Sequence, residues 1–431
     1  MTVRFDDAWT AAQAVGRTLA ESGWKTIVLR DMIGRVSLVV DDRHQELAEE
    51  RANELAARLK EGAGRFAASA TVLRASEMFA PDTVFQDQSV VWSDEARMFG
   101  RLERGVVGGE WTQVTTAPPS RRVTLYGFKG GVGRSTATFM LARHLAEQGR
   151  CVLVIDLDLE SPGVGPLLED QDRYPPFGIV DQLVEAAVGN DDGLEIVRRS
   201  TRIRGRGNGE VWLAPSGGLP RAGYDYLAKL NRAYSGVQLD GGVGVGFAQR
   251  LSDAVTACEE QVSRWSRSPD VVLLDSRAGL HDIAAVALTQ LADLNLLFAA
   301  DNRQTWSGYG MLFTQWRDAG RATVIRDRLK IIAALVPADA SGYLQSFQDR
   351  AQMCFADFLY DNAAAGDGEA YNPAPDDDDA PHYPIPVHFV GELVGLDSDT
   401  RGHWHSSELV TAAYRDFLVT TTSLILGGTD G

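Results

Sequence analysis

A glycine-rich segment at residues 127–136 has the residue types of a phosphate-binding turn. It reads Gly-Phe-Lys-Gly-Gly-Val-Gly-Arg-Ser-Thr, and it follows an apolar run that is typical of a buried strand. Glycines let backbone N–H groups close around a phosphate without interference from Cβ atoms. A helix that begins after the turn adds partial positive charge. We therefore expect phosphate to bind at Gly130, Gly131, Val132, Gly133, Arg134, Ser135 and Thr136. The Ser135 hydroxyl stands where it would ligate Mg²⁺.

Two positions depart from the standard phosphate-loop pattern, GxxxxGK[ST]. Phe128 stands at the first glycine position, and Arg134 stands at the lysine position. Arginine keeps the charge and can bind phosphate through two hydrogen bonds, but its planar fork is larger than an ammonium group. It need not place the charge where a transition state requires it. The substitution therefore predicts nucleotide binding with slow turnover, in which Arg134 is still a catalytic residue.

Two further segments end an apolar run in carboxylates. Residues 151–158 read Cys-Val-Leu-Val-Ile-Asp-Leu-Asp, and residues 270–279 read Asp-Val-Val-Leu-Leu-Asp-Ser-Arg-Ala-Gly. Carboxylates at the carboxyl ends of neighbouring parallel strands converge on the ligand crevice. We therefore expect Asp156, Asp158 and Asp275 to lie beside the glycine-rich turn. An aspartate-rich turn that only ends a buried strand is the alternative for the first pair.

Together, these three segments resemble the MinD/ParA class of dimerising P-loop ATPases. Lys129-Gly-Gly-Val-Gly-Arg-Ser-Thr136 resembles the "deviant" Walker A motif of that class, in which an extra lysine precedes the glycines. The combination of KGGVGR with DSRAG is similar to a variant branch often met in bacterial conflict or signalling operons. The resemblance implies ATP and Mg²⁺ as cofactors and a nucleotide-dependent homodimer in which two subunits enclose the nucleotides.

The resemblance also implies a role for each matching residue. Lys129 would reach the phosphates of the partner subunit's nucleotide, and Asp158 would polarise or orient the attacking water. Asp156 would lie in the outer shell of Mg²⁺, and Asp275 would hold Mg²⁺ through water. Arg277 replaces the proline that is usual in the third motif. It would either lie close to the γ-phosphate and stabilise transferred charge or serve as a structural ion-pair partner.

The elements that position these residues follow from the hydrophobic pattern. From Val123 onward, apolar runs alternate with helical patterns, which is typical of an α/β fold with a doubly wound, mostly parallel sheet. The strands are expected at 123–126, 151–156, 211–214, 271–274, 294–299, 330–336 and 386–390. The helices are expected at 135–148, 178–187, 247–265, 281–291, 304–317, 342–360 and 408–426.

The chain is long enough for more than one folding unit. Residues 1–114 are predicted to form a small N-terminal α/β domain of unknown role, with helices at 5–22 and 45–61 and strands at 26–29, 35–40 and 85–92. Residues 115–122, Thr-Thr-Ala-Pro-Pro-Ser-Arg-Arg, have the composition of a linker. Residues 123–431 are then the P-loop NTPase domain, with a mobile acidic loop at 362–384.

Charge and composition limit the partners. The net charge of −17 disfavours nucleic acid and anionic lipid, although arginines crowd one stretch at Arg198, Arg199, Arg202, Arg204 and Arg206. The apolar runs are too short to span a bilayer, the N-terminus lacks an apolar signal region, and the three cysteines form no pair. A cytoplasmic protein that docks on no membrane is expected.

The favoured function is a nucleotide-dependent switch that dimerises with ATP, hydrolyses it slowly and regulates an unknown protein partner. A non-hydrolysing nucleotide-binding adaptor is the alternative, because Arg134 replaces the usual lysine. A DNA-partitioning ATPase is a further alternative, because of the arginine-rich stretch.

Overall fold

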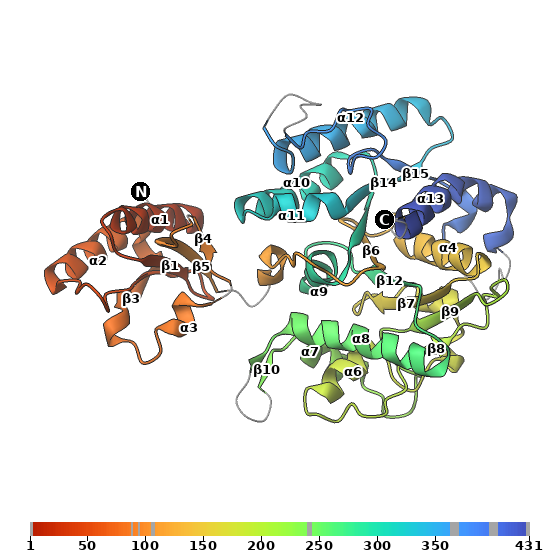
Figure 1. Cartoon of the computed structure of the whole chain (residues 1–431), viewed down its shortest axis with the longest axis horizontal. Coiled ribbons are helices and arrows are strands. Elements are labelled where there is room, and N and C mark those ends of the chain that lie inside the picture. The colour runs from red at the N-terminus through yellow and green to blue at the C-terminus, as the bar shows by residue number, and fades with distance from the viewer. Residues whose placement is uncertain are drawn as a thin grey trace. The chain divides into compact units, whose positions relative to one another are not determined.

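The computed structural model describes residues 3–87, 89–93, 95–104, 108–238, 244–362, 370–395 and 404–427. The chain divides into two compact units, Met1–Thr112 and Gln113–Gly431. Both units are drawn in Figure 1, the first in red to orange and the second in the remaining colours.

The first unit is a five-stranded sheet in the order β3-β2-β1-β5-β4. Its β1 strand pairs antiparallel with β2 and parallel with β5. Apolar residues of helices α1 and α2 pack with one face of the sheet, as Leu19, Leu38 and Leu59 show. The elements are α1 Phe5–Glu21, β1 Thr26–Arg30, β2 Val36–Val40, α2 Glu49–Ala63, β3 Ala67–Arg74, α3 Asp82–Phe85, β4 Val91–Trp92 and β5 Phe99–Glu103.

The strand predicted at 85–92 is wrong for most of its length. Phe85 ends the short helix α3, and only Val91–Trp92 is a strand. Between them, the Asp87 carboxylate accepts a hydrogen bond from the Ser89 N–H, and the Asp87 carbonyl accepts one from the Val90 N–H. This local turn uses backbone groups that a strand ladder would need. The prediction also missed β3 and β5, which complete the sheet.

The second unit alternates strands and helices. Its strands are β6 Arg122–Gly127, β7 Cys151–Leu157, β8 Arg198–Arg199, β9 Glu210–Ala214, β10 Val237–Gln238, β11 Gly244–Val245, β12 Val271–Ser276, β13 Leu294–Ala299, β14 Leu329–Val336 and β15 Ile385–His388. Its helices are α4 Arg134–Glu147, α5 Gly165–Leu168, α6 Ile179–Ala186, α7 Tyr226–Ala233, α8 Phe247–Trp265, α9 Asp282–Val286, α10 Arg303–Asp318, α11 Ala322–Ile325, α12 Ser341–Phe358 and α13 Glu408–Gly427.

Eight of these strands form one sheet in the order β15-β14-β13-β6-β12-β7-β9-β8. Every neighbouring pair is parallel except β8 with β9. Helices α4 and α13 pack on one face and helices α6, α8 and α9 on the other, so both faces are covered (Figure 1). This is why β7 and β12 are buried along their whole length rather than alternately. The predicted α/β fold class with a mostly parallel sheet is confirmed.

The predicted linker falls within the second unit, and its first residue is hydrogen-bonded there. The Thr115 N–H donates to the Thr289 carbonyl at 3.0 Å, and Arg328 donates to the Thr115 carbonyl. Of the acidic loop predicted at 362–384, residues 363–369 lie outside the described part of the chain. Farther along it, the buried Lys330 ammonium donates to the carbonyls of Asp378 and Ala380. The mobility of the loop stays a prediction.

Helix α13 is the one described helix that is long and apolar enough, by length and composition, to cross a membrane. Part of it is buried: Val410, Phe417 and Ile425 pack with α4 and the sheet. Core helices of globular proteins pass the same test, so this finding is weak support for a membrane span.

Candidate nucleotide site

The glycine-rich turn joins β6 to α4 in an open conformation. Gly131 and Gly133 have φ values of 78° and 79°, which residues with a side chain rarely adopt. A Cβ atom at Gly130 or Gly131 would meet nothing within 4 Å. Within the described residues, no group accepts a hydrogen bond from the N–H groups of Gly130 to Gly133. The turn therefore presents free donors to open space, as a phosphate cradle requires.

The three predicted aspartates meet at the carboxyl end of the central strands. Strand β12 lies between β6 and β7, and Asp275 pairs in register with Asp156. Asp156 and Asp275 are almost fully buried, and Asp158 is 8% exposed. The Ser135 hydroxyl donates to Asp275 Oδ2 at 2.7 Å. The sheet order therefore brings carboxylates that are more than 100 positions apart in the sequence to the start of α4.

Arg134 lies at the centre of this acidic group. Its Nε donates to Asp275 Oδ1 at 2.9 Å, and its Nη2 donates to Asp158 Oδ2 at 3.0 Å. The Arg134 side chain is only 9% exposed. Thr138, one helical turn later, donates to Asp275 Oδ1 at 3.3 Å and completes the contacts of that carboxylate. Sequence reasoning missed Thr138, although its i+4 spacing from Arg134 places it on the same helix face.

Burial and repulsion between neighbouring carboxylates raise the pKa values of two of these aspartates. Burial, reinforced by the charge of Asp275, raises the pKa of Asp156 to about 7. The N–H groups of Gly165 and Asp158 donate to Asp156 and oppose that shift. Burial also raises the pKa of Asp158, while the Arg134 guanidinium opposes the rise. The positive charge of Arg134 thus does not fully compensate the negative charge of the three carboxylates.

Replacing Asp156 with asparagine is expected to flatten the pH dependence of stability. A carboxyl whose pKa is raised on folding stabilises the protein fully below its unfolded pKa, near 3.8, and this contribution is lost as pH rises through about 7. The wild type should therefore lose about 3 kcal/mol more than the variant between about pH 5 and about pH 8. Urea unfolding in EDTA at the two pH values measures the difference. Parallel pH profiles would contradict the assignment.

The signature lysine faces solvent. Lys129 is exposed, and its ammonium lies 6.0 Å from the centre of the Phe128 ring. Phe128 packs closely on helix α10, because a Cβ atom at Gly308 would lie 2.2 Å from its ring. The aromatic side chain at the first glycine position of the standard motif therefore connects the turn to α10, while the Lys129 side chain extends into solvent.

Arg277 lies in an ion pair that the sequence did not reveal. It pairs with Glu160 in the loop after β7. Glu160 also accepts a hydrogen bond from the Tyr234 hydroxyl at 2.5 Å, and its Oε1 lies 3.4 Å from His281 Nε2. This contact joins the loops after β7 and β12 to the end of α7. The ion-pair alternative for Arg277 is thus seen, and its action on a γ-phosphate stays a prediction.

The oxygen donors at this site suit Mg²⁺, which prefers hydroxyl, carboxylate and water ligands. Ser135 and Asp275 already share a hydrogen bond, and Asp156 lies on the adjacent strand. Open space beside Gly130 and Gly131 leaves room for phosphate next to them. The residues present therefore fit a nucleotide with Mg²⁺.

The arginine-rich stretch is partly neutralised. Arg199 pairs with Glu210 at 3.4 Å, and Arg202 pairs with Asp170. Arg198, Arg204 and Arg206 are exposed. This stretch includes the edge strand β8, away from the glycine-rich turn in the sheet order.

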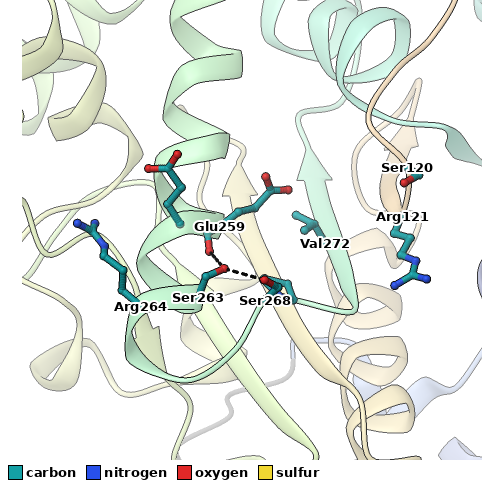
Figure 2. Close-up of a pocket in the computed structure, with 9 residues that line it drawn as sticks. Ser120, Arg121, Glu259, Ser263, Arg264, Ser268 and Val272 are labelled. Atoms are coloured by element: carbon teal, nitrogen blue, oxygen red, sulfur yellow. Dashed lines mark hydrogen bonds between the residues drawn. The ribbon is translucent and has the colours of Figure 1, made fainter.

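A cavity of about 560 Å³ lies near the amino ends of the central strands β6 and β12. Figure 2 shows Arg264 on one side and Arg121 on the other, with Ser263 hydrogen-bonded to Ser268 between them. None of the predicted site residues lines this cavity. Its mixed charges indicate no particular ligand.

Residues 123–347 match the model of the family described as the CobQ/CobB/MinD/ParA nucleotide binding domain. The matched region covers more than half of the chain, so the chain belongs to this family of nucleotide-binding proteins. The resemblance inferred from the three motifs is thereby confirmed at the level of the family and its fold.

Among individual proteins, the chain is 34% identical over 95 residues to the cytosolic Fe-S cluster assembly factor cfd1 of Aspergillus terreus, and 34% identical over 94 residues to that of Aspergillus oryzae. These alignments cover 20% of this chain and 30% of the relatives' own length.

Solved structures with a similar fold include the MinC:MinD complex of Aquifex aeolicus, at 17% identity and a TM-score of 0.42 over 70% of this chain and 96% of that one. A ParA family ATPase from Chlorobium tepidum gives 14% identity and a TM-score of 0.44 over 70% and 99%. Cobyrinic acid a,c-diamide synthase from Mycobacterium smegmatis, solved with an ATP analog and magnesium, gives 19% identity and a TM-score of 0.40 over 72% and 97%.

Proposed function

We propose that this protein is a cytoplasmic, nucleotide-dependent molecular switch. It binds ATP with Mg²⁺, closes into a face-to-face homodimer, hydrolyses ATP slowly and so controls a protein partner. The observation that carries the proposal is the meeting of Arg134, Ser135, Asp158 and Asp275 directly after a phosphate cradle with free N–H groups.

Each residue of the site has its own role in binding or hydrolysis. The N–H groups of the turn and the N-terminus of α4 bind the phosphates, and Ser135, Asp156 and Asp275 hold Mg²⁺. The ion, when bound, neutralises the developing charge on the phosphates. Asp158 orients the attacking water and can accept its proton, because burial raises the pKa of this carboxyl and makes it a better base. The exposed Lys129 completes the site of the second subunit.

The Glu160–Arg277 ion pair offers a route for the nucleotide state to reach the surface. It joins the loops after β7 and β12, which both border the site, and Tyr234 extends it to α7. A change at Asp158 or Asp275 would therefore alter contacts two elements away.

A non-hydrolysing adaptor is the second candidate, and one observation favours it. Arg134 is held by two carboxylates, and one of them is the proposed catalytic Asp158. An arginine in this arrangement can support binding without placing its charge on the transferred phosphate. The two candidates differ in turnover alone.

Phosphate release from ATP and from GTP, each with Mg²⁺, separates them. Slow ATP turnover in the wild type that falls at least about tenfold in Lys129→Ala is expected, because the variant removes a charge that stabilises the transition state. Lys60→Ala, which removes an exposed lysine from the first unit, is the matched control. No turnover in the wild type would select the adaptor, and equal turnover in wild type and Lys129→Ala would remove the lysine from the mechanism.

A further inference from the structure

A groove lies between helices α10 and α12, apart from the residues of the nucleotide site. It has a volume of about 400 Å³. Both helices supply its lining, which consists of Arg303, Trp306 and Ser307 of α10 and Arg350, Met353, Cys354, Asp357 and Phe358 of α12. These eight residues define what is called the α10–α12 groove below. The two helices lie next to each other in Figure 1, in the cyan to blue part of the second unit.

Contacts with neighbouring residues fix the positions of the aromatic side chains of the groove. Trp306 packs edge-on against Phe347 with ring centres 5.0 Å apart, and its Nε1 donates to Asp301 at 2.8 Å. Phe358 lies close to α10, where a Cβ atom at Gly310 would be 3.3 Å from its ring. The glycine thus lets the aromatic ring approach the neighbouring helix. A fixed aromatic floor of this kind is typical of pockets that receive one anchoring side chain.

The rim of the groove exposes adaptable apolar side chains. Met353 is 60% exposed, and Trp306 and Phe358 are partly exposed. Methionine is unbranched and polarizable, so it adapts to the shape of a bound side chain and is common on protein-binding surfaces. Exposed apolar groups that gather in a groove, rather than occurring singly, indicate an interaction site.

The charges at one end of the groove are positive. Arg303 is exposed and forms no ion pair within the described residues. Arg350 is half exposed and pairs with Asp301 at 3.1 Å. The Asp301 carboxylate is shared, because Ser346 donates to it at 2.9 Å and Trp306 also donates to it. Arg303 in particular is available to a carboxylate, while Asp357 at the lining of the groove limits the attraction for a polyanion.

We propose that the α10–α12 groove binds a short acidic segment of a protein partner. One bulky apolar side chain of that segment enters between Trp306 and Phe358, and a neighbouring carboxylate contacts Arg303. Apolar contacts supply the affinity, and the arginine fixes the orientation of the segment. The same combination is common in the recognition of helices and peptides. Nucleic acid would not use the apolar floor in this way.

The opposite side of α10 reaches the nucleotide site. Gly308 on that side packs on Phe128 of the glycine-rich turn, and Tyr309 donates to the Phe298 carbonyl at 2.8 Å. A displacement of the turn on nucleotide binding would therefore press on α10. This coupling rests on the proposed function, whereas the docking itself does not. Because coupling is reciprocal, a bound segment would also alter nucleotide affinity.

Selection from a random peptide library on the full chain tests the docking. Enriched peptides should carry an aromatic or large aliphatic residue flanked by Asp or Glu. Fluorescence anisotropy of a selected peptide should show binding at least about tenfold weaker to Arg303→Glu and to Met353→Asp, since both change the groove directly. Arg415→Glu, at an exposed position of α13, is the charge-matched control and should bind as the wild type does.

Three outcomes would overturn the docking: no enrichment, enriched peptides without acidic residues, or groove variants that both bind the selected peptide as tightly as the wild type does. Thermal unfolding of Arg303→Glu and Met353→Asp shows whether each variant is folded. Binding of a fluorescent ATP analogue to the same variants separates the two proposals. Peptide binding in a protein that binds no nucleotide supports the groove and contradicts the proposed switch.

Discussion

Replacing Arg134 with methionine is expected to lower the free energy of unfolding by about 3–5 kcal/mol. The substitution keeps an unbranched apolar stem but removes the cation between Asp158 and Asp275. Two buried carboxylates then lack their partner, and leaving a buried charge uncompensated costs more than the ion pair contributed. Urea denaturation of the full chain measures the loss.

Two further variants decide whether the loss comes from charge. Arg134→Lys keeps the cation and should be destabilised less than Arg134→Met. The double variant Arg134→Met with Asp158→Asn should recover part of the stability, because it removes one of the uncompensated carboxylates. Additive losses in the double variant would show that Arg134 contributes by packing rather than by its charge.

Replacing Asp158 with alanine is expected to reduce ATP turnover about 100-fold and to trap the ATP-bound dimer. Loss of a positioned general base typically costs about 10²–10⁴ in rate, while the turn and Ser135 that bind the nucleotide remain. Phosphate release gives the rate, and light scattering during gel filtration gives the mass with ATP and without it.

The control for this variant is Asp170→Ala, which removes an aspartate paired with Arg202 outside the site. It should turn over ATP and dissociate as the wild type does. Because Asp158 also binds Arg134, thermal unfolding should be compared between the two variants. A monomeric Asp158→Ala protein at saturating ATP would contradict the dimer mechanism, even if its turnover is lost.

The local hydrophobic pattern was sufficient to predict many strands and helices of the second unit. The expected strands at 151–156 and 271–274 correspond to β7 and β12, and the helix at 247–265 corresponds to α8. These elements are long, strongly apolar or strongly periodic, so the neighbouring residues alone specify them. The first unit was predicted less well, because its strands β4 and β5 are only two and five residues long.

The sequence alone determined the class of fold and the glycine-rich turn, because strand, turn and helix follow one another within fewer than about 30 residues. Only the tertiary structure decided which carboxylates hold Arg134, that Glu160 joins Arg277 to Tyr234, and that α10 and α12 form a groove. These contacts link residues far apart in the chain. They depend on the order of strands in the sheet and on how its helices pack, which no local periodicity specifies.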